Sequence, residues 1–307
     1  MYRKRISASL AILLIFCAAL FLQFNTGTFS GYAHIDDKDL RYWNYSGEVI
    51  TGAQDFTLNG STSHCWLLLH SFTATPAEMK ETAFTIHDTF NDTVRVPRLT
   101  GHGEVPSHIT GLTLDDWYLQ IQAEYAALSS SCDQVNVVGS SYGGTLAYKL
   151  SQDLSAYDKL GNVYILNGYL GTSTEWYYPP PDRLMEIGAD SVLYQEKWNI
   201  AQSKSAEGRA AHIAYWTFPL ETAKNSLTFV RATLADMPNA TAPKSMLIMH
   251  SHKDRVADPK KVVLAYEQIP VSDKDIRWFD DSNHVLLIDV SRKEVVQSII
   301  DWEKVRR

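Results

Sequence analysis

The chain has 307 residues, of which 45% are hydrophobic and 21% are charged, and its formal net charge is −7. These ordinary fractions favour a packed globular protein and argue against a disordered or low-complexity chain. The negative charge, with no basic stripe beyond the first five residues, argues against a nucleic-acid-binding protein.

The chain opens with Arg3, Lys4 and Arg5, and an uncharged, mostly apolar run follows from Ile6 to Phe24. A helix of nineteen residues spans about 28 Å, which is close to the hydrocarbon thickness of a bilayer. We therefore expect residues 1–24 to be a membrane anchor whose positive flank stays inside, with the rest of the chain on the periplasmic or extracellular side. A cleaved secretory signal, which would leave a secreted protein, is the alternative.

Residues 25–46 are polar and aromatic without periodicity, which predicts a linker before one folded domain at 47–307. In that domain short strands alternate with helices, which predicts an α/β fold with a mostly parallel sheet and helices on both faces. The expected strands are 48–51, 55–58, 65–70, 93–96, 134–140, 162–167, 245–250 and 275–279. The expected helices are 76–89, 113–130, 142–153, 258–267 and 291–305.

Cys65 and Cys132 each stand at the start of an expected strand. If these two strands are parallel neighbours, the thiols can come within bridging distance, and an exported protein meets an oxidising compartment. A disulfide is one interpretation, and two buried free thiols are the other. Sequons of the N-x-[ST] type have a meaning only in a source that glycosylates exported proteins. They begin at Asn44, Asn59, Asn91 and Asn239.

The strand at 134–140 runs into Gly139-Ser140-Ser141-Tyr142-Gly143, and a helix is expected directly afterwards. A G-x-S-x-G sequence between a strand and a helix is typical of a nucleophile elbow, where a sharp turn presents a serine hydroxyl to a base. Glycines two residues on either side of Ser141 leave room for the strained backbone. We predict that Ser141 is a nucleophile; a glycine-rich loop is the alternative.

Residues 168–243 separate two strands that a crossover of about a dozen residues could join. This segment is rich in aromatic residues and is too long and too apolar for a plain loop. We predict a cap over the carboxyl ends of the strands, where open parallel sheets bind ligands. Trp216 and Phe218 are its candidate substrate-binding residues, although a packing subdomain is the alternative.

A serine nucleophile needs a histidine base and an acid, and in sheets with such an elbow these follow the serine in the order acid, then histidine. Asp254 lies in the loop after the strand at 245–250, and His284 lies in the polar turn after the strand at 275–279. Both are strand-end loops, where functional groups are expected. We therefore predict Asp254 as the acid and His284 as the base.

Other residues compete for these roles. Asp280 and Asp281 are rival acids, but aspartates in a turn are more typical of solvated positions. His250 and His252 form a candidate metal pair, yet no H-E-x-x-H motif accompanies them, so we predict neither a metal nor a cofactor. His212 is the remaining histidine after the predicted nucleophile.

An oxyanion hole needs two N–H donors, one from the residue after the nucleophile and one from a loop after an earlier strand. The first is the backbone N–H of Tyr142. The second is predicted to be the backbone N–H of Phe72, in the loop that follows the strand at 65–70.

The segment from Leu67 to Met79 resembles the oxyanion segment of bacterial carboxylesterases and monoacylglycerol lipases of the α/β-hydrolase fold. The resemblance covers roughly residues 48–305, and it implies that fold and the Ser141, Asp254 and His284 triad. Further matching segments are Pro97 to Gly103, Asp115 to Trp117, the elbow, Phe218 to Leu220, His250 to Val256, and Asn283 to Asp289.

The chain departs from this family at two positions. Ser71 stands where the family usually has glycine, and a serine there adds strain if the position needs a positive φ. Tyr142 is bulkier than the residue that usually follows the nucleophile, and its side chain is expected to narrow the acyl pocket.

We thus expect a serine hydrolase that cleaves carboxylic esters of small or medium acyl groups. Its substrate would be a small-molecule ester or a lipid, and its N-terminal segment would contact the membrane. Lysophospholipase, thioesterase, peptidase and acyltransferase activities stay open on the same fold, as does a non-catalytic binding module. The sequence leaves the oligomeric state open.

Overall fold

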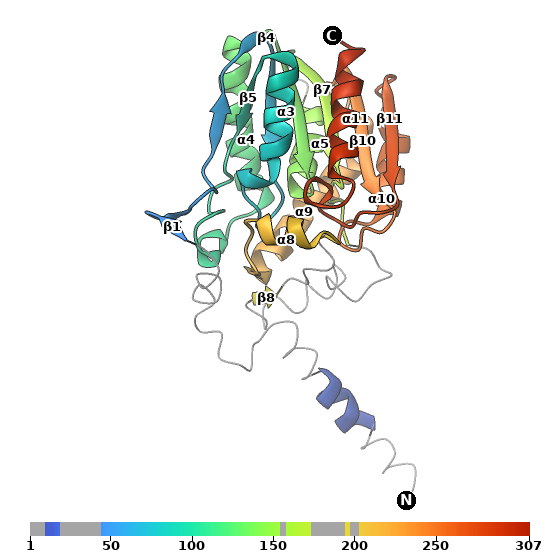
Figure 1. The fold of residues 1–307 in the computed structure, drawn as a ribbon. Coiled ribbons are helices and arrows are strands. Elements are labelled where there is room, and N and C mark those ends of the chain that lie inside the picture. The colour runs from blue at the N-terminus through green and yellow to red at the C-terminus, as the bar shows by residue number, and fades with distance from the viewer. Residues whose placement is uncertain (1–9, 19–43, 154–157, 173–193, 197–202) are drawn as a thin grey trace, which may run out of the picture.

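The computed structural model describes residues 10–18, 44–153, 158–172, 194–196 and 203–307 (Figure 1). Its centre is a seven-stranded sheet in the order β11-β10-β7-β6-β4-β5-β3. Neighbouring strands are parallel except β3 and β5, which are antiparallel, so the predicted mostly parallel sheet is confirmed. The strands are β3 (Phe56–Leu58), β4 (Ser61–Leu69), β5 (Asp92–Val96), β6 (Gln134–Ser140), β7 (Leu160–Leu166), β10 (Ser245–Ser251) and β11 (Lys274–Phe279).

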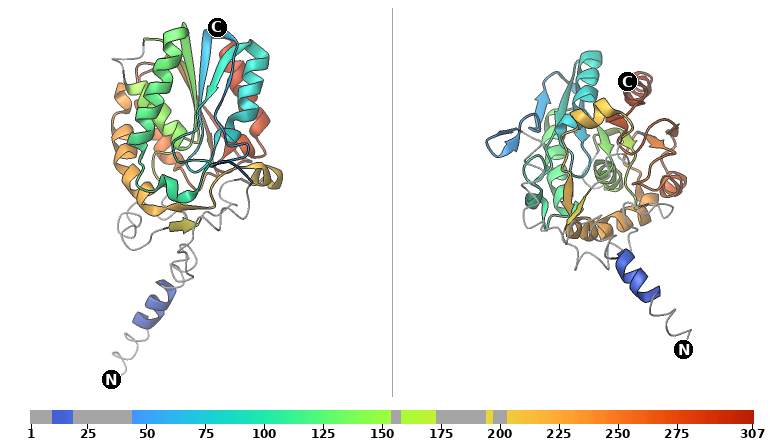
Figure 2. Two further views of the ribbon diagram at one scale, coloured as in Figure 1. Left: turned by 90° about the vertical axis from the view of Figure 1, so that its left-hand side faces the viewer. Right: turned by 60° about the horizontal axis from the view of Figure 1, so that its bottom comes forward.

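Helices cover both faces of this sheet (Figure 2). Along β4, Leu67 and Leu69 belong to one hydrophobic cluster, whereas Trp66 and Leu68 belong to another, as the two-residue period of a strand requires. The first cluster joins the sheet to α4 (Leu114–Ser131), α5 (Tyr142–Gln152), α9 (Leu220–Ala235) and α10 (Pro259–Gln268). The second joins it to α3 (Lys80–Phe90) and α11 (Arg292–Lys304).

Local capping explains where two of these helices begin. At the start of α4, the Thr113 N–H donates to Asp116 Oδ2 at 2.8 Å while the Asp116 N–H donates to the Thr113 hydroxyl, which is a capping box. The helix α10 begins with Pro259, and the Asp258 side chain accepts from the Lys260 N–H at 3.0 Å. Proline lacks a backbone N–H, but at the first helical position an N–H would have no acceptor within the helix, so no helical hydrogen bond is lost.

The 168–243 segment is only partly described, because 173–193 and 197–202 lie outside the described residues. Its later part, α9, belongs to the helical layer: Thr222 Oγ1 donates to the Ile109 carbonyl at 2.7 Å, and Ser226 Oγ accepts from the Leu114 N–H at 3.2 Å. In Figure 1, α8 and β8 lie beyond the sheet at the end opposite the C-terminus. The remaining elements are β8 (Tyr194–Glu196), α8 (Ala206–Ala211), β9 (Thr217–Pro219) and the 3-10 helix η4 (Met237–Asn239).

A small hairpin precedes the main sheet. The strands β1 (Tyr45–Ser46) and β2 (Val49–Ile50) pair antiparallel, and the Tyr45 hydroxyl donates to the Glu104 carbonyl at 2.8 Å. The end of the predicted linker therefore belongs to the folded body; residues 25–43 lie outside the described residues.

Within the predicted anchor, the structure describes residues 10–18, which are helical, and the rest of the run from Ile6 to Phe24 lies outside the described residues. The exposed large apolar side chains in this helix include Leu10, Ile12 and Phe16. In the part of the chain that is described, no helix is both long enough and apolar enough to span a membrane.

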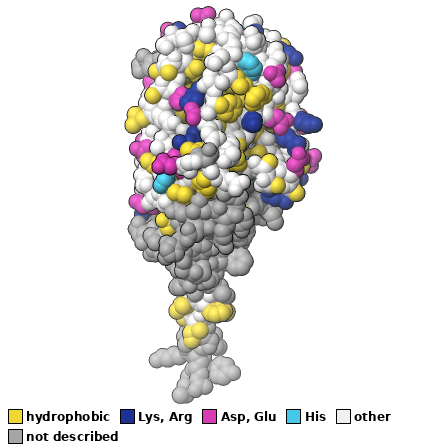
Figure 3. Space-filling view, turned by 60° about the vertical axis from the view of Figure 1, so that its left-hand side comes forward, with side chains coloured by type: hydrophobic (Ala, Val, Ile, Leu, Met, Phe, Trp, Pro, Cys, Tyr) yellow, Lys and Arg dark blue, Asp and Glu magenta, His cyan; other side chains and the backbone are white. Residues whose placement is uncertain are grey.

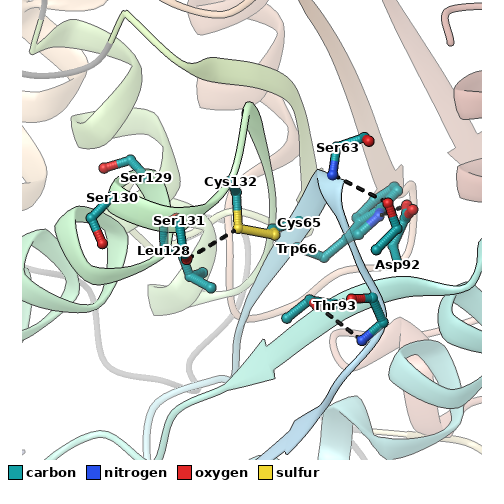
Figure 4. Close-up of a disulfide and its surroundings, with 12 residues drawn as sticks. Ser63, Cys65, Trp66, Asp92, Thr93, Leu128, Ser129, Ser130, Ser131 and Cys132 are labelled. Atoms are coloured by element: carbon teal, nitrogen blue, oxygen red, sulfur yellow. Dashed lines mark hydrogen bonds between the residues drawn. A yellow bond between two sulfur atoms is a disulfide. The ribbon is translucent and has the colours of Figure 1, made fainter.

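A disulfide joins Cys65 of β4 to Cys132, which lies just before β6 (Figure 4). The two strands are parallel neighbours, and Cys65 lies opposite Val135 in their register. The Cα atoms of the two cysteines are 6.1 Å apart, and both residues are buried. The bond therefore ties the strands together away from the ends where Leu69 and Ser140 finish them.

The surface carries charges of both signs. On the face in Figure 3, Lys and Arg side chains are interspersed with Asp and Glu. Ion pairs form among such groups, and Arg95 contacts Glu124 at 2.8 Å and Asp55 at 2.6 Å. Pairs of this kind, which are partly exposed, contribute little to stability.

Candidate active site

Ser141 occupies a sharp turn between β6 and α5 with a φ of 53°. Positive φ is strained for a serine, and such strain gathers at functional sites. The flanking glycines are required by contact: a Cβ on Gly139 would lie 2.2 Å from the Gly143 carbonyl oxygen. A Cβ on Gly143 would lie 2.2 Å from the Leu69 carbonyl oxygen. The predicted strand-turn-helix context of the elbow is thus present.

Two loops from neighbouring strands bring His284 and Asp254 to this serine. His284 Nε2 lies 2.8 Å from Ser141 Oγ, and His284 Nδ1 lies 2.8 Å from Asp254 Oδ2. All three residues are buried, at 5%, 3% and 2% exposure for Ser141, His284 and Asp254. With its proton on Nδ1, the imidazole donates to the carboxylate and accepts from the hydroxyl, which is the arrangement that a base needs.

The Asp254 carboxylate is also held by its own loop. Its Oδ1 accepts the N–H groups of Val256 at 2.8 Å and Ala257 at 3.0 Å. These bonds leave Oδ2 directed at His284, and charge-assisted bonds of this kind fix orientation strongly. The rivals Asp280 and Asp281 are exposed, and Asp280 pairs with His252 at 2.9 Å.

His250 is buried behind the acid, with Nε2 3.6 Å from Asp254 Oδ2. Burial lowers the pKa of His250 to about 4, and this effect outweighs the attraction of the Asp254 charge. His250 is therefore neutral near pH 7, so it does not compete with His284 for the negative charge of Asp254. Both His250 and His252 contact the Trp278 ring, with centroid distances of 5.7 Å and 4.4 Å, and His252 turns to the surface.

The loop after β4 approaches the elbow. The rings of Phe72 and Tyr142, the two predicted oxyanion residues, stack with centroids 4.8 Å apart. The expected strain at Ser71 is wrong, because its φ is not positive; the strained residue of this loop is Thr73, with a φ of 65°. The left-handed turn thus falls one residue after Phe72, and a serine side chain is accommodated before it.

The two predicted cap residues differ in burial. Phe218 in β9 is buried, and its ring centroid lies 5.4 Å from that of Phe72. Trp216, two residues earlier, is half-buried. The structure therefore brings Phe218 next to a predicted oxyanion residue.

Sequence reasoning missed two polar residues at this site. Asn167 follows β7 with a φ of 44°, and its amide donates to the carbonyls of Asn283 and His284, while its Oδ1 accepts the Ser251 N–H at 2.8 Å. It thereby fastens the histidine loop to the ends of β7 and β10. The residue could have been suspected from its place at a strand end, beside the glycine of Asn167-Gly168.

The second missed residue is Glu78, in the 3-10 helix η2 (Pro76–Met79). Its carboxylate is buried and contacts Ser71, directly before Phe72. A glutamate among small and apolar residues was the signal in the sequence, but its partner was not predictable from spacing.

Comparison with known proteins places this geometry in a family. The model of the alpha/beta hydrolase family matches residues 57–298. The chain belongs to this family. It is 23% identical over 261 residues to a carboxylesterase of Bacillus subtilis (strain 168), covering 83% of this chain and 97% of the relative. It is 24% identical over 255 residues to a thermostable monoacylglycerol lipase of Bacillus sp. (strain H-257), covering 83% of this chain and 95% of the relative.

Solved structures agree with this assignment. One described for the metagenome-derived lipolytic enzymes LipS and LipT superposes with a TM-score of 0.71 at 25% identity, covering 83% of this chain and 99% of that one. The monoacylglycerol lipase of Paleococcus ferrophilus matches with a TM-score of 0.71 at 14% identity, covering 82% and 98%. The predicted α/β-hydrolase fold is confirmed, and together these relatives support a carboxylic ester hydrolase.

Proposed function

We propose that this chain hydrolyses carboxylic esters of small or medium acyl groups through an acyl-enzyme formed on Ser141. The observation that carries the proposal is the unbroken hydrogen-bond chain from Ser141 Oγ through His284 to Asp254, with both distances at 2.8 Å. A serine hydroxyl becomes a useful nucleophile only when such a base is in place.

In this mechanism Ser141 Oγ attacks the ester carbonyl carbon while its proton passes to His284 Nε2. The carbonyl oxygen becomes an oxyanion, which the N–H groups of Phe72 and Tyr142 would stabilise. When the tetrahedral intermediate collapses, His284 returns the proton to the leaving alcohol. Water then attacks the acyl group by the same route and frees Ser141, while Asp254 stabilises the imidazolium throughout.

The preference for small or medium acyl groups is supported by the rings around Phe72. The centroids of Tyr142, Phe218 and Trp117 lie 4.8, 5.4 and 5.8 Å from that of Phe72. A group of rings of this kind would suit an apolar chain and would limit the space beside the nucleophile. The names of the relatives point to carboxylesters and monoacylglycerols as substrates.

A fluorophosphonate probe and a panel of acyl esters test the proposal. Wild-type protein should be labelled, and Ser141→Ala should lose both the label and most of a rate enhancement of about 10⁶-fold. Ser140→Ala, which leaves Ser141 in place, should still be labelled. A panel with graded acyl lengths, together with lysophospholipid, thioester and peptide analogues, identifies the leaving group. A wild-type protein that is not labelled would indicate a non-catalytic binding module instead.

We also propose that the catalytic domain is exported and tethered to a membrane by the N-terminal segment. Arg3 to Arg5 followed by the uncharged run to Phe24 supports this placement, as does a disulfide, which persists in oxidising compartments. The protein should stay in the membrane fraction after a high-salt wash, because the attachment is apolar. A mature terminus near Gly31 or His34, found by mass spectrometry, would instead indicate a cleaved signal. A domain digested only after lysis would exclude export.

A further inference from the structure

The Glu78 carboxylate is ionised although its side chain is fully buried. Burial alone would raise its pKa, but the nearby His212 and the two hydrogen bonds from Ser71 lower it to about 2. His212 Nε2 lies 3.6 Å from Glu78 Oε2. A buried charge is stable only where hydrogen-bond donors or an opposite charge lie close to it. The position of the Glu78 carboxylate in this loop is therefore fixed by its neighbours.

Ser71 is bound to Glu78 by two hydrogen bonds. Its hydroxyl donates to Glu78 Oε1 at 2.7 Å, and its backbone N–H donates to Glu78 Oε2 at 3.3 Å. The same hydroxyl lies 3.0 Å from Ser140 Oγ. Ser71 immediately precedes Phe72, and Ser140 immediately precedes Ser141. The carboxylate therefore connects the loop that carries the proposed oxyanion donor to the turn that carries the nucleophile.

We propose that Glu78 is a positioning residue that holds the Phe72 N–H in register with Ser141, acting through the Ser71 hydroxyl. This rests on the proposed function, because an oxyanion hole matters only if Ser141 attacks an ester. The reason is geometric: an oxyanion donor works only at hydrogen-bond distance from the developing charge, and displacements below 1 Å reduce the rate severely. Two bonds to a carboxylate are stronger and more directional than bonds between neutral groups.

Glu78→Gln is the direct test, because it keeps the side-chain shape and removes the charge. Glu81→Gln is the matched control, since Glu81 is half-exposed and contacts Arg292 at 3.5 Å. We expect Glu78→Gln to lower kcat for a short-chain nitrophenyl ester by about 10- to 100-fold, with KM within about twofold of wild type. The affinity for a boronic acid, which forms a tetrahedral adduct on serine, should fall in parallel. If Glu78 only stabilised the fold, the folded variant would keep the kcat, the KM and the boronic acid affinity of the wild type.

A double-mutant cycle tests whether Glu78 acts through Ser71. Ser71→Ala removes one hydroxyl and should lower kcat in the same sense, and the Ser71→Ala, Glu78→Gln double variant should be no slower than Glu78→Gln alone. Effects that multiply would show that the two residues act independently and would overturn the proposal. If Glu78→Gln fails to fold, Ser71→Ala decides by itself, and a kcat equal to wild type would overturn it.

The outcomes separate this inference from the proposed function. A wild-type turnover that Ser141→Ala abolishes, with Glu78→Gln equal to Glu81→Gln in kcat and boronate affinity, would remove the role of Glu78 and leave the hydrolase standing. A wild-type protein with no turnover that depends on Ser141 would remove both.

Discussion

Buried carboxylates stand towards both ends of the central sheet, but their surroundings differ. Towards the amino ends of the strands, Glu303 of α11 accepts from Asn136 at 3.0 Å, Asn162 at 2.8 Å and the Tyr164 hydroxyl at 2.7 Å. At the carboxyl ends, Asp254 faces one histidine that itself faces a serine. The Glu303 carboxylate is enclosed by hydrogen-bond donors from the sheet. The Asp254 carboxylate is instead held so that its charge acts on the His284 imidazole, which can exchange a proton with Ser141.

Backbone strain follows the same division. Four non-glycine residues in the described part of the chain have positive φ, and three of them, Thr73, Ser141 and Asn167, come shortly after β4, β6 and β7. At the other end, the sheet is fastened by the disulfide and by the Trp302 indole, which donates to Ser245 Oγ at 2.9 Å. Strain persists only where the surrounding structure over-determines it. In the described residues, most of the strain thus lies at the carboxyl ends, whereas these two cross-links lie at the amino ends.

The largest expected effect comes from exchanging one carboxylate at each end for an amide. Asp254→Asn should lower kcat by about 10⁴-fold with little change in melting temperature, because the amide favours the wrong histidine tautomer. Glu303→Gln should leave kcat unchanged and lower the free energy of unfolding by about 1–3 kcal/mol, because one buried donor loses its acceptor. Urea denaturation and ester turnover measure both. A Glu303→Gln protein that is stable but inactive would contradict the division.

The disulfide gives the next largest effect. It closes a loop with a sequence separation of 67, so its loss should lower the free energy of unfolding by about 4 kcal/mol. Cys65→Ala with Cys132→Ala should show this loss with an unchanged kcat, because the bond lies at the amino end. Dithiothreitol should destabilise the wild type equally and leave the double variant unaffected. A wild type that is indifferent to the reductant would indicate two free thiols.

Much of this contrast was predictable from sequence, because the signals were local. The strand at 134–140 ends where predicted, and the elbow, Asp254 and His284 lie at strand ends that apolar runs revealed. The contacts of Glu78 with His212, and of Asn167 with the His284 loop, join segments far apart in the chain, and no periodicity encodes them. The helix α9 was not predicted, although its buried residues Leu220, Ala223, Leu227 and Val230 follow helical spacing, because the whole 168–243 segment was interpreted as a cap without assigned elements.

Acid should weaken the fold through two buried histidines, His70 directly after β4 and His250 near the end of β10. Burial lowers the pKa of His70 and of His250 to about 4 from 6.5. Between pH 6.5 and 4 the unfolded chain therefore binds protons that the folded chain does not, so stability falls as pH falls through this window. Near pH 4, each histidine should have lowered the free energy of unfolding by about 3 kcal/mol relative to pH 7. Glu78, whose pKa is lowered from 4.5 to about 2, adds a further loss only below about pH 4.5.

His250→Gln checks this origin, because it removes one of the two titrating groups. The decrease in the free energy of unfolding from pH 7 to pH 4.5 should be about half that of the wild type. His252→Gln is the control, since His252 lies two residues further along the chain, just after β10, and is half-exposed at the surface. An unchanged slope in His250→Gln would show that other groups govern acid lability.

The smallest expected effect concerns the two residues of the predicted cap, Phe218 and Trp216. Phe218→Ala removes a ring that lies 5.4 Å from Phe72, which should make room beside the nucleophile for a longer acyl chain. We expect the ratio of kcat/KM for a longer ester to that for a shorter one to rise about tenfold, since a few methylene contacts are worth this much. Trp216→Ala, which alters a half-buried neighbour, should change the ratio less. An equal loss of kcat/KM for every ester, with a lowered melting temperature, would show that Phe218 only packs the folded body. The predicted cap would then have a structural role, as the amino end of the sheet does.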